Sequence, residues 1–127
     1  MSNLPLISVV DDDESVRDAL QALVRSVGLG VMVFASAEEF LTSGRVPDTD
    51  CLILDVRMPG MNGLELQRHL AANHFGIPII FITAHGDAES RQRALNNGAV
   101  DYLFKPFSEE ALLNAIDAAL KSNGKRK

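Results

Sequence analysis

Short apolar runs alternate with amphipathic stretches along the chain. The run at 6–10 precedes a stretch at 14–27 in which valine and leucine recur three and four positions apart, and the runs at 31–34, 52–55 and 78–83 are followed by further helix-like stretches. Apolar runs of this length are typical of buried strands, and the recurring spacing is typical of a helix with one buried face. The alternation predicts an α/β protein with parallel strands and helical crossovers.

Capping residues indicate where the helices between these strands begin and end. Ser36 and Glu39 have the spacing of a capping box for the second helix, expected over 37–43. Asp87 can cap the fourth, and Ser108 begins the fifth. Gly28 ends the first helix. The sequence thus predicts five strands and five helices, for which we expect a flavodoxin-like (βα)5 fold, a doubly wound parallel sheet with strand order 2-1-3-4-5.

Composition and charge favour a single domain and argue against nucleic acid and membrane as its partners. The chain has 127 residues, 46% of them apolar, which suits a single hydrophobic core. We expect a domain over residues 1–120 and, at 121–127, a tail or the start of a linker to an effector domain. A net charge of −5 argues against nucleic-acid binding by this domain itself. The sequence has no leader-like segment and no apolar run near the ~20 residues that cross a bilayer, which predicts no membrane contact and a cytoplasmic location.

Five polar residues lie at the predicted carboxyl ends of strands. Asp11 and Asp12 follow the first strand, Asp55 ends the third, Thr83 ends the fourth and Lys105 ends the fifth. The carboxyl ends of parallel strands share one edge of the sheet, and ligands bind in the crevice there. Because the expected strand order places the first and third strands side by side, we expect the three aspartates to be neighbours.

Three crowded carboxylates repel one another and stay ionised only beside a compensating cation. Mg²⁺ prefers oxygen ligands, so we expect Asp12 and Asp55 to bind it directly and Asp11 to bind it through water. Lys105 can pair with Asp55 at rest and with a phosphoryl oxygen afterwards, while the Thr83 hydroxyl offers a neutral donor. Asp55 is therefore the candidate phosphoryl acceptor.

Ordinary structural roles compete with this interpretation for each residue taken alone. Asp12 and the two acidic residues after it are also suited to a helix N-terminus, Thr83 to a strand, and Lys105 to a turn before Pro106. Asp55 is harder to explain in this way, because an acid after the apolar run 51–54 is costly to bury unless it is paired or bound. The shared edge favours the functional interpretation for the set.

Four segments carry a resemblance to a known family. They are VVDD at 9–12, LDVRMPGMNG at 54–63, ITA at 82–84 and DYLFKPF at 101–107. With these segments in this order and spacing, the chain resembles the receiver domain of two-component response regulators from residue 6 to about residue 120. The motifs are closest to the branch exemplified by the nitrogen-fixation regulator FixJ, in which a receiver is joined to a helix-turn-helix output domain.

The resemblance implies a function and a set of site residues. It implies that a sensor histidine kinase phosphorylates Asp55 with Mg²⁺, and that the domain catalyses only its own phosphorylation and dephosphorylation, so it is not an enzyme in the usual sense. Control of transcription would pass through an output domain that is missing from this chain. The bond between Lys105 and Pro106 is expected to be cis. The implied site residues are Asp11, Asp12, Asp55 and the Arg57 main-chain carbonyl for the metal, and Thr83 and Lys105 for the phosphate.

A switch hypothesis concerns the fourth helix and the last strand. We expect phosphorylation to draw the Thr83 hydroxyl inward and Tyr102 to turn into the vacated space. Phe104 shares a face of the strand with Tyr102, so both are expected at a phosphorylation-dependent homodimer contact through the fourth helix and fifth strand. An ordinary core position is the competing interpretation for Tyr102. Arg57 and His85 are expected beside the phosphate, unless they are plain loop residues.

Other functions fit part of the same pattern. A phosphatase with an aspartyl nucleophile needs a second acid two positions further on, where this chain has Arg57, and a lid for which it has little room. A stand-alone receiver and an inert flavodoxin-like domain that binds a partner protein both remain compatible with the fold. Failure to bind Mg²⁺ would favour the inert domain.

Overall fold

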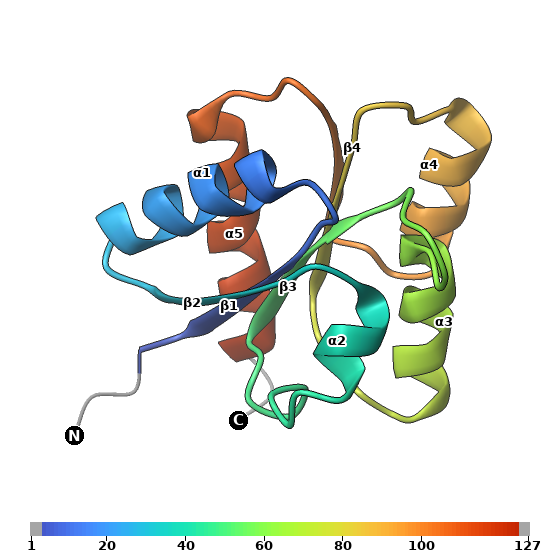
Figure 1. The fold of residues 1–127 in the computed structure, drawn as a ribbon, viewed down its shortest axis with the longest axis horizontal. Coiled ribbons are helices and arrows are strands. Elements are labelled where there is room, and N and C mark those ends of the chain that lie inside the picture. The colour runs from blue at the N-terminus through green and yellow to red at the C-terminus, as the bar shows by residue number, and fades with distance from the viewer. Residues whose placement is uncertain (1–3, 125–127) are drawn as a thin grey trace.

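A single parallel sheet forms the centre of the protein. The structure is a computed structural model that describes residues 4–124, and the side chains of residues 4–122. The strands stand in the order β2-β1-β3-β4-β5, which confirms the predicted order (Figure 1). They are β1 Leu6–Val10, β2 Gly30–Phe34, β3 Cys51–Asp55, β4 Ile79–Thr83 and β5 Asp101–Phe104.

Helices cover both faces of this sheet. Figure 1 shows α1 and α5 on one face and α2, α3 and α4 on the other. A sheet covered in this way needs strands without a polar face, which explains why every residue of β3 and β4 is buried. No helix within residues 4–124 is long and apolar enough to cross a membrane. The helices are α1 Glu14–Ser26, α2 Ala37–Leu41, α3 Gly63–Ala72, α4 Ala88–Asn96 and α5 Glu109–Gly124.

Two apolar clusters, one on each face of the sheet, form the core. Successive strand residues point to opposite faces, so Ile53 packs beneath α1 and α5 while Leu52 and Leu54 pack beneath α2, α3 and α4. Burying each such side chain contributes roughly 1.5–3 kcal/mol. The α1/α5 cluster includes Ile7, Val9, Leu20, Ile53, Ile80, Ile82, Leu112 and Ile116. The α2–α4 cluster includes Val10, Phe40, Leu52, Leu54, Leu66, Leu70, Phe81 and Tyr102.

Side-chain caps begin the helices where the sequence predicts them. The Asp13 carboxylate accepts the N–H of Ser15 at 2.9 Å at the start of α1, so one of the three consecutive acids has the capping role. Ser36 caps α2 by accepting the Glu39 N–H at 3.0 Å. The expected capping box of α2 is incomplete, because the Glu39 carboxylate accepts the Ala35 N–H and not that of Ser36. Asn62 and Glu65, in contrast, form a complete capping box at the start of α3.

Two helices end elsewhere than expected. α2 stops at Leu41 instead of continuing to residue 43, because the hydroxyl groups of Thr42 and Ser43 donate to the Glu38 and Phe40 carbonyls at 3.0 and 2.7 Å and favour a turn there. α5 continues to Gly124, past the domain boundary expected at residue 120. Residues 125–127 of the expected tail lie outside the described part of the chain.

Candidate functional site at the carboxyl edge of the sheet

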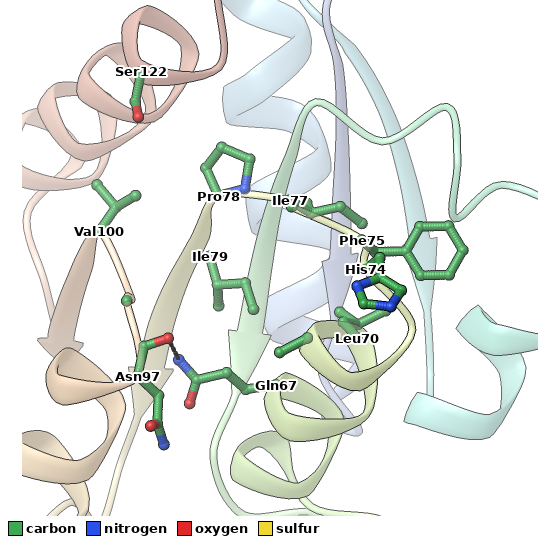
Figure 2. A pocket seen from close by; sticks show the side chains of 13 residues that line it. Gln67, Leu70, His74, Phe75, Ile77, Pro78, Ile79, Asn97, Val100 and Ser122 are labelled. Carbon is green, nitrogen blue, oxygen red and sulfur yellow. Dashed lines mark hydrogen bonds between the residues drawn. The ribbon is translucent and has the colours of Figure 1, made fainter. Parts of the chain in front are cut away.

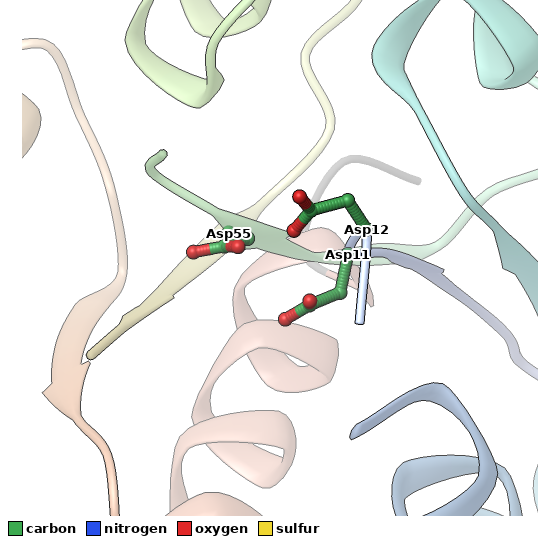
Figure 3. A group of neighbouring side chains, drawn as sticks. All are labelled: Asp11, Asp12 and Asp55. Carbon is green, nitrogen blue, oxygen red and sulfur yellow. The ribbon is translucent and has the colours of Figure 1, made fainter. Parts of the chain in front are cut away.

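Three aspartates meet at the carboxyl edge of the sheet, as the strand order predicts. Asp11 and Asp12 directly follow β1, and Asp55 is the last residue of β3. These strand ends are adjacent because β1 and β3 pair, with Val10 opposite Leu54. One carboxylate oxygen from each aspartate lies within 4.8 Å of the other two. Figure 3 shows the three side chains at the ends of the two strands, with those of Asp11 and Asp12 extending toward Asp55.

Hydrogen bonds from several parts of the chain fix Asp11. Its Oδ1 accepts the Asp13 N–H at 2.9 Å, and its carbonyl oxygen accepts a guanidinium N–H of Arg17 at 2.8 Å. Its own N–H donates to the Phe34 carbonyl at 3.1 Å and extends the pairing of β1 with β2. The carboxylate and the main chain of Asp11 are therefore both held before any ligand binds.

Lys105 pairs with the expected Asp55 and, more closely, with Asp11. Its ammonium donates to Asp11 Oδ2 at 2.9 Å and lies 4.0 Å from Asp55 Oδ2. The Asp11 side chain is fully buried, whereas that of Asp55 keeps 8% exposure, so the ammonium compensates a more completely desolvated charge beside Asp11. The bond between Lys105 and Pro106 is cis, as the resemblance implied.

Asp55 carries a charge that its surroundings disfavour. Burial raises the pKa of Asp55 to about 6, and the negative charge of Asp11 adds to the rise, while the Lys105 ammonium offsets part of it. The carboxylate therefore remains the nucleophilic form near neutral pH, but with an unfavourable electrostatic energy. The three carboxylates offer only oxygen donors, so the set fits a hard divalent cation such as Mg²⁺.

The predicted site residues line one cavity of about 200 Å³. Thr83 is fully buried there, and its hydroxyl oxygen accepts the His85 N–H at 3.2 Å. The side chains of Arg57 and His85 are exposed, so they form the solvent side of the cavity. The lining consists of Asp11, Asp12, Asp13, Asp55, Arg57, Thr83, Ala84, His85 and Lys105.

Gly63 packs directly against the main chain of Asp55. A Cβ at Gly63 would overlap the Asp55 carbonyl oxygen and lie 3.0 Å from Val56 Cα. The Gly63 N–H also donates to the Val56 carbonyl at 2.9 Å. Hydrophobic spacing did not indicate this contact, because a contact across an irregular loop leaves no periodic signal.

Tyr102 is buried in this structure, with 4% exposure. Its ring centroid lies 6.1 Å from that of Phe81 and 5.4 Å from that of Phe104, which is itself 47% exposed. A Cβ at Gly86 would lie 2.7 Å from Tyr102 Oη and 2.6 Å from Thr83 Cγ2. The loop after β4 thus packs closely on both proposed switch residues, and Tyr102 already has the inward position that the hypothesis assigns to the phosphorylated state.

A larger cavity, of about 490 Å³, lies at the opposite edge of the sheet, beside the start of β4. Figure 2 shows Gln67 of α3 reaching toward the end of α4, where its side-chain amide donates to the carbonyls of Ala94 and Asn97 at 3.1 and 3.3 Å. None of the predicted site residues lines this cavity. Within residues 4–124, the one cluster of metal-ligating side chains is the aspartate group at the carboxyl edge.

Comparison with known proteins identifies the family. The family model of the response regulator receiver domain matches residues 7–117. The chain belongs to this family. As a receiver, it has its aspartate cluster at the edge of the sheet that the resemblance implied.

Individual relatives support the same assignment and the FixJ-like branch. The receiver is 49% identical over 126 residues to nodulation protein W of Bradyrhizobium diazoefficiens, covering 99% of this chain and 56% of that protein. It is 42% identical over 114 residues to the transcriptional regulatory protein FixJ of Azorhizobium caulinodans, covering 90% and 54%. The structure of the response regulator StyR superposes with a TM-score of 0.90 at 51% identity, covering 97% and 62%. The chain therefore spans a little more than half the length of these relatives.

Proposed function

We propose that this receiver is a phosphorylation switch that accepts a phosphoryl group on Asp55 from a sensor histidine kinase. One observation carries the proposal: three groups line the same cavity. They are the Asp55 carboxylate with its raised pKa, the Lys105 ammonium and the buried Thr83 hydroxyl. Phosphoryl transfer requires mainly positioning and charge neutralisation, which such a set supplies.

A Mg²⁺ ion fits the donor set at the edge of the sheet. The side chains of Asp11, Asp12 and Asp55 and the main-chain carbonyl of Arg57 would hold it. The ion would supply positive charge that offsets the carboxylates and the oxygens of the incoming phosphoryl group. The crowding of the three carboxylates supports this assignment, because their repulsion calls for a compensating cation.

The transfer itself exchanges one bond to phosphorus for another. An oxygen of the Asp55 carboxylate bonds to phosphorus as the bond between phosphorus and the imidazole nitrogen of a phosphohistidine breaks, and that nitrogen keeps the bonding electron pair. The Lys105 ammonium and the Thr83 hydroxyl then donate hydrogen bonds to phosphoryl oxygens. Water reverses the modification by displacing the Asp55 carboxylate and releasing inorganic phosphate. These are the only covalent reactions that we assign to the receiver.

The output of the switch is proposed to be a homodimer contact through α4 and β5. When Thr83 turns toward the phosphoryl group, the packing of Gly86 on both Thr83 and Tyr102 couples that movement to the Tyr102 ring. The exposed Phe104 beside Tyr102 supplies apolar surface for the contact. By analogy with the relative named transcriptional regulatory protein FixJ, we propose control of transcription through an output domain.

Intact mass measurement tests the phosphorylation chemistry. Incubation with acetyl phosphate and Mg²⁺ is expected to add one phosphoryl group, because Asp55 shares a cavity with Lys105 and Thr83 and, unlike the fully buried Asp11, keeps some exposure. The isosteric Asp55→Asn variant and a chelator-treated sample are the controls, and both should lack the adduct. An adduct that persists in Asp55→Asn would show that another residue is the acceptor.

A further inference from the structure

The loop between β3 and α3, residues 56–62, connects the phospho-acceptor to the next helix. Its two ends are fixed by main-chain hydrogen bonds, since Val56 N–H donates to the Ile82 carbonyl at 3.2 Å and Gly63 N–H donates to the Val56 carbonyl at 2.9 Å. The middle of the loop carries Arg57, whose carbonyl is the proposed main-chain ligand of the metal. What holds the middle of the loop therefore matters for the position of that carbonyl.

A carboxylate from another helix reaches this loop. Glu38, in the first turn of α2, accepts the Met61 N–H on its Oε2 at 2.9 Å, across 23 positions of sequence. The approach is close enough that a Cβ at the neighbouring Gly60 would lie 2.8 Å from the same oxygen. Gly60 has a φ of 73°, a backbone conformation that glycine adopts without strain. The loop is thus shaped to present an N–H group to Glu38.

The helix that carries Glu38 is itself firmly placed. Ser36 caps α2, Glu39 accepts the Ala35 N–H at 2.6 Å, and Phe40 is fully buried in the α2–α4 cluster. The hydrogen bond from Met61 also holds the pKa of Glu38 below its usual range, because it stabilises the ionised carboxylate. A fixed, charged acceptor therefore stands beside a loop whose central residues have irregular backbone.

We propose that Glu38 is a positioning residue for the metal and phosphoryl site, which acts by holding the β3–α3 loop so that the Arg57 carbonyl faces the aspartates. This inference rests on the proposed function, because it gives the Arg57 carbonyl a ligand's role. Glu38 contacts neither metal nor phosphate. It acts only through the Met61 N–H group.

Magnesium titration and amide hydrogen exchange test the role of Glu38. In Glu38→Ala, the Mg²⁺ dissociation constant is expected to rise about three- to tenfold, the range expected for the loss of one hydrogen bond. The Met61 amide of the metal-free variant should exchange faster with solvent by a similar factor. Glu38→Gln should restore most of both values, because its amide oxygen still accepts a hydrogen bond. Glu110→Ala, at an exposed glutamate of α5, removes the same charge and should change neither value.

Each outcome separates this inference from the function on which it rests. Unaltered Mg²⁺ affinity in Glu38→Ala would overturn the role of Glu38 but would leave the proposed metal site unchallenged. Weaker affinity with unchanged Met61 exchange, or a Glu38→Gln variant as weak as Glu38→Ala, would also overturn it, because the effect would then arise from charge and not from the loop. Wild-type protein that binds no Mg²⁺ would overturn the proposed function, and this inference with it.

Discussion

Asp55 is the residue whose environment opposes its charge most clearly. Its pKa is raised to about 6 in the folded protein, against an ordinary value of 3.8. Between these two pH values the folded state binds more protons than the unfolded state, so the stability contributed by this group is full below pH 4 and is lost as the pH rises through 6. The folded, metal-free receiver therefore has an electrostatic cost at neutral pH.

Replacing Asp55 by asparagine should remove that cost. Without metal at pH 7, Asp55→Asn is expected to increase the free energy of unfolding by about 1–2 kcal/mol, less than the pKa shift alone implies because water at the open side of the cavity screens the charges. The gain should shrink below pH 6 and vanish near pH 4. Urea unfolding with a chelator at several pH values measures it. A variant less stable than wild type at pH 7 would contradict the prediction.

Single residues were predictable where their role follows from strand position. The three aspartates, Thr83 and Lys105 all line the cavity because the carboxyl ends of parallel strands share an edge. The pairing of Lys105 with Asp55 was predictable, but its closer contact with Asp11 was not, since that depends on how deeply each carboxylate is buried. The contact of Gly63 with the Asp55 main chain and that of Glu38 with the Met61 N–H were also not predicted. Both involve the irregular loop after β3, which has no hydrophobic period, and Glu38 is distant from that loop in the sequence.

At the level of elements, the loop between β4 and α4 links the site to the last strand. Gly86 in this loop has room for no side chain, since a Cβ there would lie 2.6–2.7 Å from Thr83 Cγ2, Phe104 Cε1 and Tyr102 Oη. The first of these atoms belongs to a short, buried side chain, whereas the other two are ends of rings that can turn. An added methyl group should therefore displace the aromatic rings first.

Gly86→Ala is expected to push Tyr102 outward and to cost about 1–3 kcal/mol of stability through overpacking. The protein has one tyrosine and no tryptophan, so quenching of its tyrosine fluorescence by acrylamide reports on Tyr102 alone. Quenching should increase in this variant. Gly44→Ala is the matched control, because a Cβ there meets nothing within 4 Å and should leave Tyr102 unchanged despite the strain of a φ of 80°. Equal quenching in wild type and Gly86→Ala would argue against the contact.

The starts of elements were easier to predict than their ends. Ser36 and Asp87 cap helices as expected, because a capping side chain acts within three residues of its own position. The early end of α2 depends on Thr42 and Ser43 hydroxyls that turn back on the helix. The extension of α5 to Gly124 depends on residues that show no apolar period. Hydrophobic spacing does not indicate where side-chain hydrogen bonds end a helix or where a helix continues without an apolar face.

For the whole molecule, the proposed dimer surface can be tested with two exposed phenylalanines. Phe104 is 47% exposed beside Tyr102, whereas Phe75 is 36% exposed and lines the cavity at the opposite edge of the sheet. Phe104→Asp should raise the dimer dissociation constant of beryllofluoride-treated protein by about tenfold or more, because it places a charge in an apolar contact. Phe75→Asp should not change it. Sedimentation velocity measures both, and normal dimerisation by Phe104→Asp would exclude this surface.

The sheet order was predictable for the whole chain, since 2-1-3-4-5 is a common order for five parallel strands and a doubly wound sheet covers both faces of strands as apolar as β3 and β4. The inward position of Tyr102 agrees with the competing interpretation of this residue as a core residue, and hydrophobic spacing alone did not choose between that interpretation and a switch role. Sequence pattern defines which strands are neighbours, and close packing defines which of two side-chain arrangements is occupied.

The two apolar clusters share no buried residue, so the sheet separates the packing of α1 and α5 from that of α2, α3 and α4. Tyr102 and the buried Ala94 of α4 belong to the α2–α4 cluster, together with Met58 of the loop after Asp55. α5 packs in the other cluster. In the proposed switch, a rearrangement around Tyr102 therefore does not require the α1/α5 cluster to repack. Under the proposed homodimer contact, a segment joined to the end of α5 would receive the signal through the pairing of two receivers, and not through a bend transmitted along its own chain.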